Sequence, residues 1–95
     1  MKLTAAQQRA LDAIVARGFA TVSSNYSWYY CDGQKFRYAV VQRLRELGMV
    51  HGRAVPAGQP YPDGRVNALR VSVHIVVPAP WVSQTETEEK VNTNG

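Results

Sequence analysis

The sequence KFRYAVVQRLRELGMVHGR, residues 35–53, has the clearest periodicity in the chain. Its apolar residues recur at intervals of four, four and three, which places them on one face of a helix. They are Phe36, Val40, Leu44 and Leu47. Gly48 is the type of residue that ends a helix. The spacing therefore predicts a helix over 36–48 with this stripe in the core, followed by a strand over 49–55.

The opposite face of this predicted helix is polar and basic. Arg45, Gln42 and Lys35 carry the donors and acceptors that suit guanine and adenine edges. The neighbouring arginines, including Arg37 and Arg43, would contact DNA phosphates on either side. Arg43 is the weakest of these candidates because Glu46, three residues later, can pair with it. The alternative is that all of these are solvated surface charges. The residues expected to contact DNA are Lys35, Arg37, Tyr38, Gln42, Arg45, Arg53 and Arg65.

The charge of the whole chain supports a polyanionic partner. The 95 residues carry a net charge of +4, and the sequence pI is about 9.6. Residues 1–82 hold ten basic and four acidic side chains, so their net charge is +6. Nucleic acid is the commonest partner of such a basic domain, although the charge can also serve solubility alone. A chain of this length forms one domain with a single core.

Upstream of this region, the sequence predicts a first helix over 4–17. Thr4 is a good N-cap, and Gln7 completes a capping-box pattern three residues later. Gly18 stands where a glycine commonly ends a helix.

Residues 19–35 contain an unusual concentration of aromatic side chains before an Asp32-Gly33 pair. The aromatic density and the Asp-Gly turn predict a strand or hairpin, with a short helical turn at 23–28 as the alternative. The aromatic residues are Tyr26, Trp28, Tyr29 and Tyr30.

Three roles remain open for these aromatic residues. Trp28 and Tyr30 would share one strand face, with Tyr26 in phase with them, and the first role is that this face is core. The second role is a protein-binding patch. The third is stacking on unpaired bases, which ranks last because no basic residue lies between Arg17 and Lys35.

The rest of the chain is predicted to be β structure followed by a tail. Residues 57–65 form a turn-rich loop, and 66–77 alternate like one long strand with a register change near Asn67. Two prolines end that strand, and Trp81 is expected to fold back onto the core. The domain is therefore expected over 1–81, with a disordered tail over 82–95.

No catalytic or metal-binding constellation stands out from the sequence. His51 and His74 have no second ligand at metal spacing, and a single cysteine, Cys31, forms no internal disulfide or multi-cysteine zinc site. A pairing of Cys31 and Asp32 with a distant histidine is close to chance. The expectation is a non-enzymatic, cytoplasmic protein without metal, cofactor or membrane span.

Residues 35–53 resemble the second half of a winged helix-turn-helix domain. In that family an R-L-x-x-x-G-(hydrophobic)-V sequence closes the recognition helix and enters the wing, and residues 43–50 here are RLRELGMV. LTAAQQRALDAI, residues 3–14, is similar to the first helix of the family. The resemblance covers about residues 3–77. It departs from the family at YSWYYCDG, residues 26–33, where the family has a second helix.

The resemblance implies a small α+β domain with a long β-hairpin, the wing, that binds double-stranded DNA as small phage, prophage or bacterial transcription regulators do. The helix over 36–48 would lie in the major groove, and the loop over 56–65 would lie on the backbone or minor groove. A lone domain of this type usually dimerises, so a homodimer is expected. The alternative is a protein-interaction module, such as a phage-encoded protein that binds a host factor through the four aromatic residues Tyr26, Trp28, Tyr29 and Tyr30.

Overall fold

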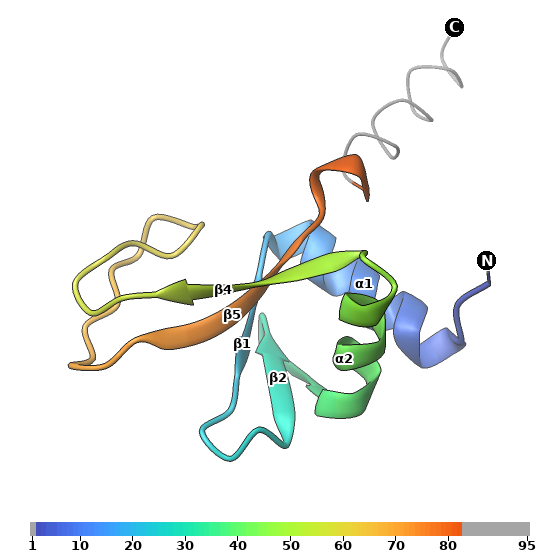
Figure 1. Cartoon of the computed structure of the whole chain (residues 1–95), viewed down its shortest axis with the longest axis horizontal. Helices are drawn as coiled ribbons and strands as arrows, with labels where there is room; N and C mark the ends of the chain where they lie inside the picture. The colour runs from blue at the N-terminus through green and yellow to red at the C-terminus, as the bar shows by residue number, and fades with distance from the viewer. Residues whose placement is uncertain (1, 83–95) are drawn as a thin grey trace, which may run out of the picture.

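The computed structural model describes residues 2–82, which form a small α+β domain (Figure 1). A five-stranded antiparallel sheet has the order β3-β2-β1-β5-β4. A short third helix at 80–82 follows the last strand. The other elements are α1 (Ala5–Arg17), β1 (Ala20–Val22), β2 (Trp28–Cys31), β3 (Gln34–Arg37), α2 (Tyr38–Glu46), β4 (Val50–Val55) and β5 (Val73–Pro78).

The first helix forms as its sequence predicts. The hydroxyl oxygen of Thr4 accepts a hydrogen bond from the backbone N–H of Gln7 at 3.1 Å, and the side-chain oxygen of Gln7 accepts one from the backbone of Thr4 at 3.0 Å. This reciprocal pair satisfies two backbone donors at the helix start. Gly18 ends the helix with a positive φ of 103°, and its N–H donates to the carbonyl of Ile14.

The predicted hairpin is also confirmed, with β2 and β3 joined at Asp32 and Gly33. Both residues have positive φ angles, 50° and 82°, which is the conformation that a two-residue turn of this kind requires. The expectation that Trp28 and Tyr30 form the core face of the strand is wrong, because Tyr29 is buried and Tyr30 is 46% exposed. The core side of the hairpin is the side that faces α2, where Tyr29 stacks on Tyr38.

The second helix is shorter than predicted, because residues 36 and 37 belong to β3. The extended backbone at Arg37 separates Phe36 from the helical phase, although Phe36 is still buried. Leu44 is fully buried as expected, and it is joined by Val41. The other two members of the predicted stripe, Val40 and Leu47, are only half-buried. The buried face of α2 is therefore rotated toward Val41.

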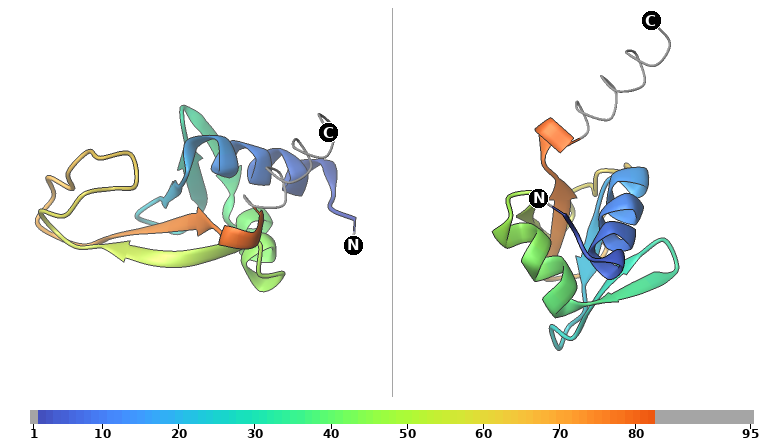
Figure 2. Two further views of the ribbon diagram at one scale, coloured as in Figure 1. Left: turned by 90° about the horizontal axis from the view of Figure 1, so that it is seen from above. Right: turned by 90° about the vertical axis from the view of Figure 1, so that its right-hand side faces the viewer.

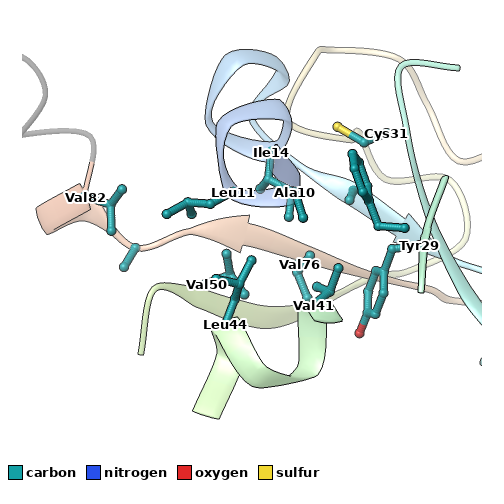
Figure 3. Packing of buried hydrophobic residues seen from close by; sticks show 13 residues of the cluster. Ala10, Leu11, Ile14, Tyr29, Cys31, Val41, Leu44, Val50, Val76 and Val82 are labelled. Carbon is teal, nitrogen blue, oxygen red and sulfur yellow. The ribbon is translucent and has the colours of Figure 1, made fainter. Parts of the chain in front are cut away.

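The main core lies between the two helices and one face of the sheet (Figure 3). Leu11 and Ile14 come from α1, and Val41 and Leu44 come from α2. The sheet contributes the side chains of alternate residues to the same cluster. These sheet residues are Ala20, Tyr29, Cys31, Phe36, Val50 and Val76.

The predicted long strand over 66–77 is wrong in its first half. Of the predicted strand, only the part within β5, from Val73 onward, pairs with β4. The preceding apolar residues Leu69 and Val71 are 59% and 64% exposed. Asn67 explains the difference, because its buried side-chain amide donates to the carbonyls of Val55 and Val71 at 2.9 and 3.0 Å. These bonds close residues 56–72 into an irregular loop in place of a longer ladder.

This loop turns back along the sheet (Figure 2). It covers part of the face that the helices leave open. The ring of Tyr61 stacks on Phe19 with 5.6 Å between the ring centroids. Phe19, Val55 and Ile75 form a second buried cluster beneath it.

The chain leaves the sheet at Pro78 and returns toward α2. The indole N–H of Trp81 donates to the carbonyl of Gly48 at 3.3 Å, although about half of this side chain is exposed. Val82, which the sequence assigns to the tail, is buried against the main core. The rest of the predicted tail, residues 83–95, lies outside the described residues. No helix within residues 2–82 is long and apolar enough to cross a membrane.

Candidate nucleic-acid interface

A hollow of about 410 Å³ separates α2 from the long β4–β5 hairpin. We call it the α2 hollow. Two side chains of one helix flank, Tyr38 and Arg45, enter it from α2. The hollow is lined by Val22, Tyr26, Tyr29, Tyr38, Arg45, Gly52, Arg53, Ala54, His74 and Ile75.

Three tyrosines form the aromatic wall of the α2 hollow. The rings of Tyr29 and Tyr38 stack with centroids 5.3 Å apart, and Tyr26 meets Tyr38 edge-on at 6.1 Å. Burial, followed by the neighbouring Tyr38, raises the pKa of Tyr29, whereas the Arg45 guanidinium lowers it by a smaller amount. The Tyr29 phenol is therefore neutral at physiological pH, and it lies close to a permanent positive charge.

The position of Arg45 depends on the absence of a side chain at Gly52. A Cβ atom on Gly52 would lie 2.6 Å from Nη2 and 2.7 Å from Cζ of Arg45. The guanidinium therefore lies directly over the glycine backbone. The salt bridges among residues 2–82 are Arg43–Glu46 and Arg65–Asp63, and neither includes Arg45. Its charge is therefore available to an anion in the hollow.

The structure brings only part of the predicted DNA-binding set together. Tyr38 and Arg45 enter the α2 hollow, whereas Arg53 borders it from β4 and has its side chain on the opposite sheet face. Gln42 lies on the same helix flank, but it is half-buried, and its enclosed amide oxygen accepts no hydrogen bond from residues 2–82. His74, which has no second ligand at metal spacing in the sequence, lines the hollow as well.

Arg65 belongs to a different part of the molecule, in the middle of the loop between β4 and β5. Its guanidinium Nε lies 2.8 Å from the carboxylate of Asp63. The backbone N–H of Arg65, followed by its side chain, lowers the pKa of that carboxyl by hydrogen bonding to its charged form. The Arg65 charge is therefore partly neutralised before any ligand arrives.

Lys35 and Arg37 lie on β3 and not on the helix. The register pairs Trp28 with Arg37 and Tyr30 with Lys35, so all four side chains share the sheet face that points away from the helices. We call this set the hairpin face. The Lys35 ammonium lies 4.5 Å from the centroid of the Trp28 ring, and the Arg37 guanidinium carbon lies 6.0 Å from it.

Sequence reasoning missed this cluster because it looked for basic residues between the aromatic ones along the chain. An antiparallel hairpin supplies them from the partner strand. The available signal was the Asp32-Gly33 turn, which fixes the cross-strand register once the hairpin is recognised.

The lone cysteine lies under the hairpin, on its helix side. Cys31 is fully buried, and its Sγ lies 3.3 Å from the carbonyl oxygen of Ala13. Burial raises the pKa of the thiol, while Arg17 lowers it by a smaller amount. An inaccessible neutral thiol fits a packing role. Within residues 2–82, no group of three or more His, Cys, Asp or Glu side chains is placed to hold a metal ion.

Comparison with known proteins adds no further constraint. No protein-family model, curated protein or solved structure matches the chain.

Proposed function

We propose that this domain binds double-stranded DNA through the α2 hollow, in the manner of a winged helix-turn-helix. The observation that supports this proposal is the guanidinium of Arg45, which lies over Gly52 in a hollow that His74 also lines. The net charge of +6 over residues 1–82 draws the same anionic partner.

The chain topology supports the winged-helix comparison. The helix α2 directly precedes β4, and β1, β5 and β4 are adjacent in the sheet in that order. Both helices pack on one sheet face, and β4–β5 extends beyond them as a long hairpin (Figure 1). The β2–β3 hairpin stands where the family has its second helix. In this comparison α2 is the recognition helix, and β4–β5 is the wing.

The side chains of the hollow favour contact with phosphates over contact with base edges. A guanidinium beside phenol hydroxyls offers several donors to a phosphate oxygen. Gln42, the expected adenine reader, has its amide oxygen enclosed, and the exposed crest of α2 carries the Arg43–Glu46 pair. We therefore assign Arg45 to the DNA backbone. Any sequence preference then comes largely from the shape and deformability of the duplex.

A matched pair of variants on α2 tests this proposal. Arg45→Gln and Arg43→Gln remove the same charge two residues apart, but only Arg45 lies in the hollow. Fluorescence anisotropy with a labelled random-sequence duplex at about 50 mM salt gives the affinities. Arg45→Gln should weaken binding about tenfold because a charge-assisted hydrogen bond is lost, and Arg43→Gln should weaken it about twofold or less.

Gly52→Ala provides a second test that keeps every charge. The added methyl group displaces the Arg45 guanidinium, and because this is the end of a flexible side chain the fold should survive. Duplex binding should fall by an amount between those of the two arginine variants. Equal losses for Arg45→Gln and Arg43→Gln, or an affinity that does not change with salt, would exclude the α2 hollow as a DNA site.

One observation favours protein binding as a second candidate function. Val66, Leu69 and Val71 are 58–64% exposed on the loop between β4 and β5. Three exposed aliphatic side chains within six residues of one loop are typical of protein contacts. A second copy of this chain would cover them in the expected homodimer, and sedimentation equilibrium of wild type against Leu69→Ser tests that state. Tyr29, one of the expected partner-binding aromatic residues, is buried and takes no part in such a contact.

A further inference from the structure

The hairpin face combines two aromatic rings with two cations on an uncovered sheet surface. Trp28 and Tyr30 come from β2, and Lys35 and Arg37 come from β3. Tyr29 and Cys31 of β2 and Phe36 of β3 point into the main core, so the hairpin is anchored from its other side. The four side chains are therefore held on a rigid platform without being needed to fill the interior.

The exposure of these side chains indicates a surface that a ligand completes. Tyr30 is 46% exposed, Lys35 and Arg37 are exposed as well, and Trp28 is half-buried. The loop over 56–72 shields the neighbouring cluster of Phe19, but it does not extend over the hairpin. The Lys35 ammonium over the Trp28 ring occupies a position where a planar base would stack.

The side chains of the hairpin face indicate which class of ligand it binds. Aromatic rings on an antiparallel sheet stack on nucleobases whose own faces are free, and adjacent cations contact the phosphates. Bases in a duplex are stacked on each other and do not offer their faces. The two cations of the face have no acidic partner among the salt bridges of residues 2–82, so the face is complementary to a polyanion.

Further cations continue the surface beyond Tyr30. The next strand pairs Thr21 with Tyr30, and Thr21 borders a smaller hollow of about 250 Å³ that also contains Arg17 and Arg65. The guanidinium of Arg17 lies 4.4 Å from the centroid of the Phe19 ring. A nucleic-acid strand with a base stacked on Tyr30 therefore meets positive charge on both sides of that ring, from Lys35 on one side and from Arg17 on the other.

We infer that the hairpin face binds single-stranded nucleic acid, with unpaired bases stacked on Trp28 and Tyr30 and phosphates on Lys35 and Arg37. This site lies on the opposite sheet face from the α2 hollow and does not depend on duplex binding there. It gives a role to Trp28 and Tyr30, which the winged-helix comparison leaves unexplained.

The test is the affinity of a fluorescein-labelled oligo(dT) of about eight nucleotides, measured by anisotropy with the full chain. An oligonucleotide of the same length with abasic sites carries the same phosphates without bases. We expect the abasic strand to bind at least about tenfold more weakly, because the stacking contribution is lost. Trp28 fluorescence in a Trp81→Phe background should be quenched by oligo(dT) and not by the abasic strand.

Two matched substitutions separate stacking from charge. Tyr30→Phe keeps the ring and should retain the affinity for oligo(dT), whereas Tyr30→Ser should lose about tenfold. Lys35→Gln should weaken binding and reduce the salt dependence, whereas Arg9→Gln, which removes an exposed charge on α1, should change the affinity much less. Circular dichroism verifies that each variant is folded.

Equal affinities for oligo(dT) and the abasic strand would overturn the inference, as would identical losses for Tyr30→Phe and Tyr30→Ser. The duplex experiment fails or succeeds separately, because Arg45→Gln should leave oligo(dT) binding unchanged. A loss of both kinds of binding in Arg45→Gln would show that one surface serves both, which contradicts two separate sites.

Discussion

The open face of the sheet is divided into two unlike halves. A single row of paired residues crosses all five strands on this face. The row runs through Lys35, Tyr30, Thr21, Ile75 and Arg53. Over β1, β5 and β4 the loop of residues 56–72 packs onto the face, and Ile75 is 2% exposed. Over β2 and β3 nothing within residues 2–82 covers it, and Tyr30 stays 46% exposed.

The difference shows how one sheet face can serve two purposes. The covered half contains the buried apolar cluster of Phe19, Val55 and Ile75, which contributes to stability because these side chains leave water on folding. The open half has aromatic rings and cations that gain little from the fold and are available to a ligand. What separates the halves is one loop, held in place by the stacking of Tyr61 on Phe19 and by the hydrogen bonds of Asn67.

The largest loss of stability is expected for a substitution in the covered half. Phe19→Ala removes a side chain that is 1% exposed, together with its contacts to Tyr61 and to the Arg17 guanidinium. The free energy of unfolding should fall by about 3–5 kcal/mol, measured by urea denaturation. A loss below about 1 kcal/mol would show that the loop does not bury this ring in solution.

A smaller loss of stability is expected when the hydrogen bonds that close the loop over 56–72 are removed. Asn67→Ala leaves the carbonyl of Val55 and the backbone N–H of Leu69 without their side-chain partner. The unfolding free energy should fall by about 1–3 kcal/mol. Hydrogen exchange should increase at the N–H of Leu69, while the amides of α1 keep their protection. Unchanged stability would mean that the loop is held by Tyr61 alone.

The smallest effect is expected in the open half. Tyr30→Ser should change the unfolding free energy by only about 0.5 kcal/mol, because the side chain is largely exposed and its strand is anchored by Tyr29 and Cys31. The same urea titration measures it. A loss comparable to that of Phe19→Ala would remove the distinction between the two halves.

Local signals were sufficient to predict part of this structure. The capping box at Thr4 and Gln7 and the turn at Asp32-Gly33 each act within a few residues, so the first helix and the hairpin follow from the sequence. The charge balance also predicts an anionic partner.

The remaining features depend on contacts that are distant in sequence. Tyr29 points inward because Tyr38 stacks on it, which periodicity within β2 does not reveal. The alternation of 66–72 resembles a strand, but the hydrogen bonds of Asn67 favour a loop. In the same way, Lys35 reaches Trp28 across the hairpin, so the basic partner of the aromatic cluster was invisible to a search along the chain.

One measurement tests the central claim that the α2 hollow contacts duplex DNA. The chemical shift of each backbone amide can be followed in ¹H–¹⁵N spectra as a blunt-ended duplex is added to the ¹⁵N-labelled protein. If the α2 hollow binds the duplex, the amide chemical shifts should change mainly at Arg45, Gly52, Ala54 and His74, and the amides of β2 and β3 should change little. Shifts confined to the hairpin face, or no shifts at a concentration where anisotropy reports binding, would contradict it.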